Sequence, residues 1–434
     1  MRALLIFVTL ACAGIVPEAQ AQPPGTLSVQ PAPMRGLPAL LARAVPRDPQ
    51  VIAAQAALAT TEARYKQARS RLFPNAALQA TRGRSNDLDG TLDVQRRTHQ
   101  VEASLRWNVY NGGADGAEMD AAGREVAGAA FDVQRARADS AEKLAEAYFD
   151  MQRLERSLLQ SQERLRDVTQ LVQQVMRQAE LGKASEVDRE LAQSSQLDAE
   201  LVHDGLLTDR LAAQIKLEAL AFEPVAQFAD FTFAPLPAQA LENADTQQAQ
   251  LRAVRERAAA ARLRVRSVAA TLAPKVDLDV SHLLNNKTTP PPSTIQQRGW
   301  SVGVSWEFPL GGGSLAQRDE SISRAQAAEV DVARAEQGAR ADLASMLPRI
   351  ANAQRTLALL DEQEKKMAFV VRGGTIQYEA GRRNLQQIIQ TRDSYFTIQQ
   401  RRSDQLHRLT LAQMRQYALA GRLLAVFGLA QEGK

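Results

Sequence analysis

Two hydrophobic patterns alternate along the chain, and they occur in the same order twice. Apolar residues that recur with a helical period predict helices at residues 37–71, 113–180 and 185–221, and again at 238–272, 313–379 and 384–429. Apolar and polar residues that alternate one by one predict two strands after the first helix of each set. We therefore expect a mainly helical protein with a few strands.

The two halves of the chain are copies of one unit. Landmark residues recur at a nearly constant separation: Pro74 and Pro274 (274 − 74 = 200), Trp107 and Trp306 (306 − 107 = 199), and Gly182 and Gly381 (381 − 182 = 199). This regularity indicates an internal duplication. The proline- and phenylalanine-rich stretch 222–237 has no helical period. We predict a first repeat at 22–221, a linker at 222–237 and a second repeat at 238–434.

The longest predicted helices carry a seven-residue repeat of apolar positions. In the first copy these positions are Leu144, Met151, Leu158, Leu165, Val172 and Ala179. Such a repeat drives helices to coil around one another. A helix of this length, at a rise of 1.5 Å per residue, would be roughly 100 Å long, which exceeds an ordinary globular domain. Pro348 is expected to kink or loosen the corresponding helix of the second copy.

The strand that precedes each long helix has one apolar and one polar face. A single alternating strand is ordinarily part of a half-buried sheet in a soluble protein. Here the helices, with their polar outer faces, offer no separate core for such a sheet to cover, and the runs have about the 9–11 residues of a tilted membrane strand. They also end in aromatic residues, as strands do at membrane interfaces. These aromatic residues are Trp107, Tyr110, Trp306 and Phe308.

Glycines follow the aromatic ends of both strands. They are Gly112 and Gly113 in the first copy and Gly311 and Gly312 in the second. Glycine permits the abrupt change of backbone direction between a membrane strand and a helix. Four strands are too few to close a barrel, and lipid cannot satisfy the open edge of a sheet. Several chains are therefore expected to share one barrel.

Residues 1–21 look like a secretory signal peptide, with Arg2 before an apolar core and Ala19-Gln20-Ala21 as the cleavage site. Cys12, the only cysteine, lies inside this segment, so the mature chain would have neither a disulfide nor a thiolate metal site. No later stretch reaches the ~18 apolar residues of a membrane-spanning helix. The net charge of +4 comes from interspersed signs, which argues against nucleic-acid binding.

Together these features resemble the TolC-like outer-membrane factor family of Gram-negative bacteria. The similarity rests on the duplicated unit, the "YNGG" and "PLGGG" junctions, and the helix turns "LGKASEVD" and "YEAGRRNLQQ". The resemblance implies a mainly α-helical protein with a membrane β-barrel. In this arrangement a homotrimer shares a twelve-stranded barrel, four strands per chain, in outer-membrane lipid, and a long coiled-coil tunnel continues it into the periplasm. The linker 222–237 would belong to an equatorial belt around the tunnel.

The resemblance also implies a gate at the periplasmic end of the tunnel. Asp188, Tyr378 and Arg383 match its polar links, and an Arg383–Asp188 link is expected. Gln387 and Gln390 occupy positions where the family carries an acidic ring, so strong cation binding is not expected there. The helix turns would contact a periplasmic adaptor, which joins the channel to an inner-membrane ABC or proton-driven transporter. The turn residues are Gly182, Lys183, Gly381 and Arg382.

Catalytic and cofactor motifs are not found. The four histidines, His99, His203, His282 and His407, lack metal-ligand spacing, and no phosphate loop or dinucleotide fingerprint occurs. We expect a passive exit duct rather than an enzyme. The "RWNVYNGGAD" junction resembles members that serve type I protein secretion, which is the favoured cargo. Drug or metal efflux with a proton-driven pump and, from a different class, a soluble periplasmic coiled-coil scaffold remain as alternatives.

Overall fold

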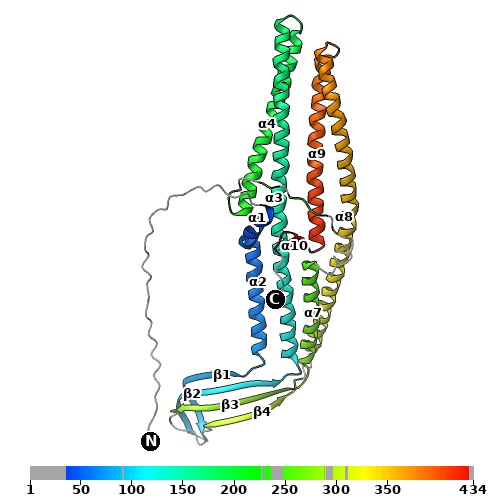
Figure 1. The fold of residues 1–434 in the computed structure, drawn as a ribbon. Helices are drawn as coiled ribbons and strands as arrows, with labels where there is room; N and C mark the ends of the chain where they lie inside the picture. The colour runs from blue at the N-terminus through cyan, green and yellow to red at the C-terminus, as the bar shows by residue number, and fades with distance from the viewer. Residues whose placement is uncertain are drawn as a thin grey trace, which may run out of the picture.

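The computed structural model describes residues 36–89, 92–225, 228–229, 231–234, 236, 248–287, 289, 297–307 and 311–429. The predicted signal peptide with Cys12, and the aromatic Phe308, lie outside these ranges. Within them the chain forms long helices that stand on one small sheet (Figure 1). None of the helices in the described part combines the length and the apolar character needed to cross a bilayer.

The helices follow the duplicated order that the sequence predicts. The first copy contains α1 (Leu37–Ala44), the 3-10 turn η1 (Val45–Arg47), α2 (Pro49–Ser70), α3 (Ala114–Glu180) and α4 (Glu186–Ala221). The second contains α7 (Ala249–Ala270), α8 (Gly313–Glu379), α9 (Leu385–Leu419) and α10 (Leu423–Val426). The two longest helices, α3 and α8, have 67 residues each and are therefore roughly 100 Å long.

The helices form a single layer in which long and short helices alternate. Near the sheet, α3 contacts α2 and α7, and α7 contacts α8. Toward the other end, α3 contacts α4 and α9, and α9 contacts α8. The short helices therefore stand in pairs, one above the other, beside the long ones (Figure 1). Two helical hairpins, α3–α4 and α8–α9, end side by side at the end farthest from the sheet.

Two predicted helices are shorter than the sequence pattern suggested. The helix expected at 37–71 is interrupted by η1, and a new helix starts at Pro49 because the Asp48 carboxylate accepts a 2.8 Å hydrogen bond from the Gln50 backbone N–H. The helix expected at 384–429 ends at Leu419, since Gly421 adopts φ 66° and closes its last turn. By contrast, α8 remains helical across Pro348.

The sheet has four antiparallel strands in the order β1-β2-β3-β4. Their bounds are Asn75–Asp89, Leu92–Tyr110, Lys275–Asn286 and Arg298–Ser305. The expected length of about 9–11 residues was too short for the first hairpin, whose strands have 15 and 19 residues. The two hairpins pair through β2 and β3, so β1 and β4 are the edges of the sheet in one chain.

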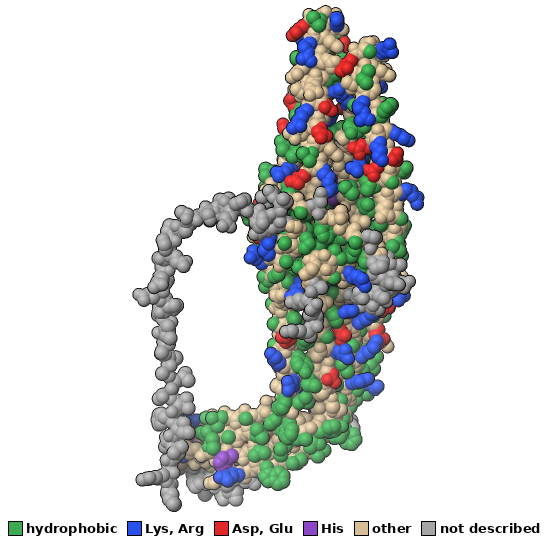
Figure 2. All heavy atoms as spheres, viewed as in Figure 1, with side chains coloured by type: hydrophobic (Ala, Val, Ile, Leu, Met, Phe, Trp, Pro, Cys, Tyr) green, Lys and Arg blue, Asp and Glu red, His purple; other side chains and the backbone are tan. Residues whose placement is uncertain are grey.

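The register of the sheet gathers apolar side chains on one face and polar ones on the other. Ala76, Leu105, Val280 and Trp300 lie in one row across all four strands. The adjacent row, which faces the other way, contains Asn75, Arg106, Asp279 and Ser301. The apolar face is uncovered in one chain: Trp300 is 76% exposed. Hydrophobic side chains dominate the sheet in Figure 2, whereas charged ones spread over the helices.

The largest hydrophobic core lies at mid-height, where the short helices meet. It joins α1 to the middle of α3 and to the ends of α4 and α9. Described residues of the linker 222–237 complete it, because Phe231 and Phe233 pack against Phe149 and Phe427. The Tyr148 and Tyr417 hydroxyls donate to the Ala229 and Ala234 carbonyls, at 2.6 and 2.8 Å. These contacts anchor the linker to the helical layer.

Candidate functional site

The first strand–helix junction needs glycine at both predicted positions. Gly112 and Gly113 have φ values of 70° and 88°, a region that side chains with a Cβ rarely adopt. A Cβ at Gly112 would also lie 2.5 Å from the Ala270 carbonyl oxygen of α7. In the second junction Gly312 has φ 72°, whereas Gly311 does not adopt a positive φ. A glycine with a positive φ thus stands directly before the long helix in both copies.

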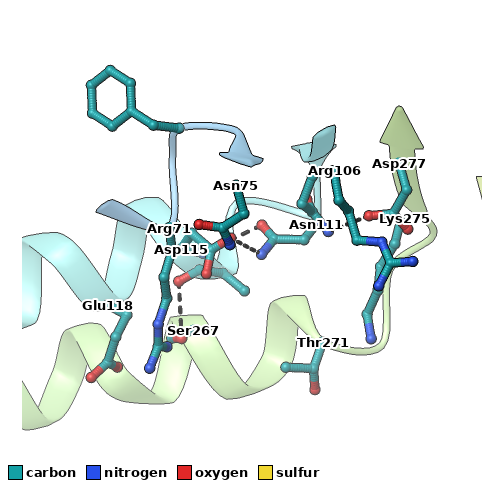
Figure 3. Close-up of a pocket in the computed structure, with 13 residues that line it drawn as sticks. Arg71, Asn75, Arg106, Asn111, Asp115, Glu118, Ser267, Thr271, Lys275 and Asp277 are labelled. Atoms are coloured by element: carbon teal, nitrogen blue, oxygen red, sulfur yellow. Dashed lines mark hydrogen bonds between the residues drawn. The ribbon is translucent and has the colours of Figure 1, made fainter. Parts of the chain in front are cut away.

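A polar cavity of about 500 Å³ lies on the polar side of the first junction (Figure 3). Residues of α3 and α7 line one side and residues of the strands line the other. The Arg106 Nε donates to Asp279 Oδ1 at 2.7 Å, and the Asn108 amide donates to Asp277 Oδ1 at 3.0 Å. Asn111 bonds Asp115 in the first turn of α3. Most of the residues around the point where sheet and helices meet are therefore charged or polar, with Phe73 and Ala114 among them.

The two tryptophans occupy equivalent places and make the same hydrogen bond. The indole N–H of Trp107 donates to the Leu72 carbonyl at 3.1 Å, and that of Trp306 donates to the Leu272 carbonyl at 3.0 Å. Each bond ties the end of a strand to the end of the helix that precedes the neighbouring strand. Sequence reasoning assigned both residues to a membrane interface. Their role as a duplicated brace could not be seen from the sequence, because it depends on the pairing of the strands.

The far ends of the two hairpins are built alike. Gly182 and Gly381 adopt φ values of 68° and 69° and terminate α3 and α8. The backbone N–H groups of Lys183 and Arg382 then donate to carbonyls five residues earlier, each at 2.8 Å. This is the Schellman arrangement, in which a left-handed glycine closes a helix. All four predicted turn residues therefore lie at the tips; Figure 1 shows these tips at the top.

Tyr378 joins the two hairpins just below their tips. Its hydroxyl donates to the Gln178 side-chain oxygen of α3 at 3.3 Å. Burial and the negative charge of Asp188 raise the pKa of Tyr378 above its usual value, which keeps the phenol protonated as a donor. The Asp188 carboxylate accepts from both the Ser185 N–H and the Ser185 hydroxyl, in a capping box at the start of α4.

Arg383 is held within its own hairpin. Its Nη2 donates to the Thr391 hydroxyl of α9 at 3.3 Å. Within the described part of one chain, no ion pair joins Arg383 to Asp188, so that link remains a prediction for the assembled protein. Gln387 and Gln390 are both exposed on α9. The five residues predicted to form the gate thus lie near one end of the molecule, on two hairpins.

Sequence reasoning missed a charged contact that joins the two hairpins. Arg164 of α3, only 9% exposed, donates to Asp198 of α4 at 2.7 Å and to Asp393 of α9 at 2.8 Å. Its guanidinium also lies 4.9 Å from the ring centre of Phe396. The sequence offers one signal for this contact. Arg164 lies directly before Leu165 of the heptad pattern, and a charged side chain next to an apolar position needs a partner. One side chain therefore connects three helices.

A second set of polar contacts joins α3 to α9 at mid-height. His407 Nε2 lies 3.1 Å from Asp150 Oδ1, and the Arg153 guanidinium lies 3.4 Å from Asp404. The hydrogen bond from His407 lowers the pKa of Asp150. Among the described residues, no group of three or more His, Cys, Asp or Glu side chains could hold a metal ion. The charged pairs His407–Asp150 and Arg153–Asp404 join α9 to α3.

Comparison with known proteins identifies the family. A family model described as outer membrane efflux protein matches residues 40–221 and 236–422. The chain belongs to this family. It is accordingly an outer-membrane protein, and its relatives are channels rather than enzymes. The two matched stretches correspond to the two copies of the duplicated unit, which confirms the fold class predicted from the sequence.

Solved structures of outer-membrane channels share this fold. The chain aligns with CusC at a TM-score of 0.80 and 16% identity, covering 93% of this chain and 99% of CusC. VceC from Vibrio cholerae gives 0.78 and 17%, covering 90% and 96%. The open state of MtrE from Neisseria gonorrhoeae gives 0.76 and 18%, covering 89% of each chain. No curated protein matches the chain. The structural similarity establishes the fold over nearly the whole chain.

Proposed function

We propose that three copies of this efflux-family chain form a passive duct across the outer membrane. The observation that carries the proposal is a four-stranded sheet whose apolar face and two edges are uncovered, standing at one end of a helical layer about 100 Å long. Such a sheet satisfies its edges only by pairing with further copies. With its apolar face toward lipid, the polar face with Arg106 and Asp279 would line the lumen.

The duct would depend on partners for energy. The channel family implies a periplasmic adaptor and an inner-membrane transporter, either an ABC protein or a proton-driven pump. The hairpin turns at Gly182–Lys183 and Gly381–Arg382 are the candidate adaptor contacts, because they form the tips farthest from the sheet. The gate would lie just below these tips, at Asp188, Tyr378, Arg383, Gln387 and Gln390. Membership in an efflux family favours this duct over a soluble scaffold.

The cargo has two candidates, each supported by one observation. The junction sequence "RWNVYNGGAD" favours export of proteins by a type I secretion system. The description of the matched family, outer membrane efflux protein, favours efflux, for which drugs or metal ions are the candidate cargo. The polar groups around the junction cavity suit both, since a water-filled lumen must pass hydrated cargo in either case.

Two experiments test the proposal. Purified protein added to planar lipid bilayers should produce discrete conductance steps, and the protein should fractionate with detergent-extracted outer membrane; recovery in the soluble periplasm without conductance would contradict a duct. Deletion of the gene then separates the cargoes. Loss of specific proteins from the culture medium would support secretion, whereas increased sensitivity to drugs or metal salts with unchanged secreted proteins would support efflux.

A further inference from the structure

Two adjacent glycines near the end of α8 differ sharply in their surroundings. A Cβ on Gly373 would meet nothing within 4 Å. A Cβ on Gly374 would lie 2.5 Å from Arg383 Nη1 and 3.2 Å from Ile388 Cδ1. The guanidinium of Arg383 therefore rests directly on the α8 backbone at Gly374, in space that any other residue would fill. Glycine inside a helix is less stable than alanine, because it loses more conformational freedom on folding. Of these two glycines, only Gly374 has surroundings that leave no room for a side chain.

The space above the Gly374 backbone that holds the Arg383 guanidinium is called the seat here. Two hydrogen bonds on α9 complete it. Arg383 Nη2 donates to the Thr391 hydroxyl at 3.3 Å, and that hydroxyl donates to the Gln387 carbonyl at 2.7 Å. Thr391 is buried, as is Gly374. The charged end of Arg383 thus fills the space between the two helices of the α8–α9 hairpin. Displacing it would remove a contact between them, close to Gln387 and Gln390.

We propose that Gly374 is a positioning residue for the periplasmic gate: it provides the seat that holds the Arg383 guanidinium between α8 and α9 and keeps the entrance narrow. The inference rests on the proposed channel function and assigns a role to a residue outside the predicted gate. A methyl group at position 374 must push the guanidinium off Thr391. We expect the fold to tolerate this change, because the atom that must move furthest is the end of the flexible Arg383 side chain, whereas Ile388 Cδ1 at 3.2 Å needs to shift by only a few tenths of an ångström.

The first test measures how accessible the Arg383 guanidinium is, and it does not depend on channel activity. Phenylglyoxal modifies accessible guanidinium groups, and peptide mass spectrometry of the full chain in detergent gives its rate at Arg383. Gly374→Ala should accelerate modification at Arg383, while Gly373→Ala, the matched control in the same helix, should leave the rate unchanged. Equal rates of modification at Arg383 in the wild type and the Gly374→Ala protein would show that Gly374 does not hold the guanidinium in place, which would overturn the inference.

The second test measures its consequence in planar bilayers. Gly374→Ala should raise single-channel conductance by the same factor as Arg383→Ser, and the double variant should show no further increase. Gly373→Ala should conduct as the wild type does. Two results would overturn the inference without affecting the proposed channel function. One is a raised conductance in Arg383→Ser but not in Gly374→Ala, and the other is a reduced conductance in Gly374→Ala. Failure of the wild type to conduct would refute the proposed function instead, together with the link from seat to gate.

Discussion

At the scale of single residues, Arg164 joins both hairpins through charged contacts with Asp198 and Asp393. Its side chain is 9% exposed, whereas its partners Asp198 and Asp393 are 64% and 42% exposed. Removing the arginine therefore leaves two carboxylates that water can solvate, which limits the loss to the hydrogen bonds and the Phe396 contact. We expect Arg164→Ala to destabilise the protein by about 1.5–3 kcal/mol.

Thermal unfolding of the detergent-solubilised protein measures this loss. Arg334→Ala is the control, because Arg334 pairs with Asp331 at a position where both side chains are well exposed. Such a surface pair contributes about 0–1 kcal/mol. Similar shifts in unfolding temperature for both variants would show that the contacts of Arg164 contribute no more to stability than a surface ion pair does.

The glutamines on α9 predict how the entrance responds to cations. Gln387 and Gln390 are exposed and neutral, so a trimer would have six uncharged groups at its entrance (two positions times three chains). Multivalent cations on the periplasmic side should block the wild-type channel only weakly. Gln387→Asp with Gln390→Asp should create a block that rising salt weakens, because six carboxylates attract cations and ions screen that attraction.

Conductance in planar bilayers with a trivalent cation tests this expectation. The double variant Gln387→Asn with Gln390→Asn shortens both side chains without adding charge, so it should remain insensitive to the cation. Strong block of the wild-type protein would mean that other acidic groups form the entrance.

At the scale of helices and strands, contacts between α3 and α9 should depend on pH. The hydrogen bond from His407 lowers the pKa of Asp150 below its usual 3.8. A carboxyl with a depressed native pKa stabilises the fold above its unfolded pKa, and this contribution disappears as the pH falls through the native value. Asp150→Asn should therefore lower stability at pH 7 by about 0.5–1 kcal/mol, the value of one solvent-screened hydrogen bond.

The difference between Asp150→Asn and the wild type should shrink as the pH falls below the usual pKa of 3.8, and it should disappear once the pH is below the lowered pKa of Asp150 in the folded protein, where Asp150 itself is protonated. Unfolding temperatures measured between pH 7 and pH 3 follow it. Asp139→Asn is the control, since Asp139 lies 4.0 Å from Arg135 with both side chains about half exposed. A difference for Asp150→Asn that persists unchanged at pH 3 would contradict the assignment.

The two faces of the sheet predict opposite responses to charge. Leu105 lies in the apolar row with Ala76 and Val280, and its neighbour Ser104 pairs with Ala77 and Ser281 on the polar side. Lysine at position 105 would meet hydrocarbon, at a cost of about 2–4 kcal/mol near the bilayer midplane. Leu105→Lys should reduce the yield of assembled protein in the outer membrane, whereas Ser104→Lys should be tolerated. Equal losses in both would mean that the faces are assigned wrongly.

Elements whose pattern is local were predictable from the sequence, and those that depend on contacts were not. Of the six predicted heptad positions, Leu144, Met151 and Val172 are buried, and Leu158, Leu165 and Ala179 are half-buried. This much was predictable because helical period alone determines which side chains share a face. The break at η1 was signalled by Pro46 and Pro49 but outweighed by the surrounding period. The Arg164 tie and the Gly374 seat could not be predicted, since each brings together side chains whose distance in space no periodicity encodes.

At the scale of the whole molecule, a single chain cannot satisfy its own surface. Trp300 is 76% exposed and Val304 71% exposed on the sheet, while Leu201 is 73% exposed on α4. The edge strands β1 and β4 also have unpaired backbone groups, which lipid cannot satisfy. The same chain must therefore supply both a neighbour for each edge and a cover for the exposed helix positions, and closed rotational symmetry does both at once.

The proposed number of copies agrees with the size of the barrel that they would form. Two chains would supply eight strands, and the interior of an eight-stranded barrel is just wide enough for its own side chains. Three chains would supply twelve strands and so a wider barrel, with more room for the lumen that the proposed duct requires. Cross-linking in mild detergent should therefore accumulate a species of three chains and no larger one, and Leu105→Lys should reduce it in proportion to the loss of assembly. A folded monomer recovered from the membrane, or a ladder that continues past three chains, would rule out the closed trimer on which the duct depends.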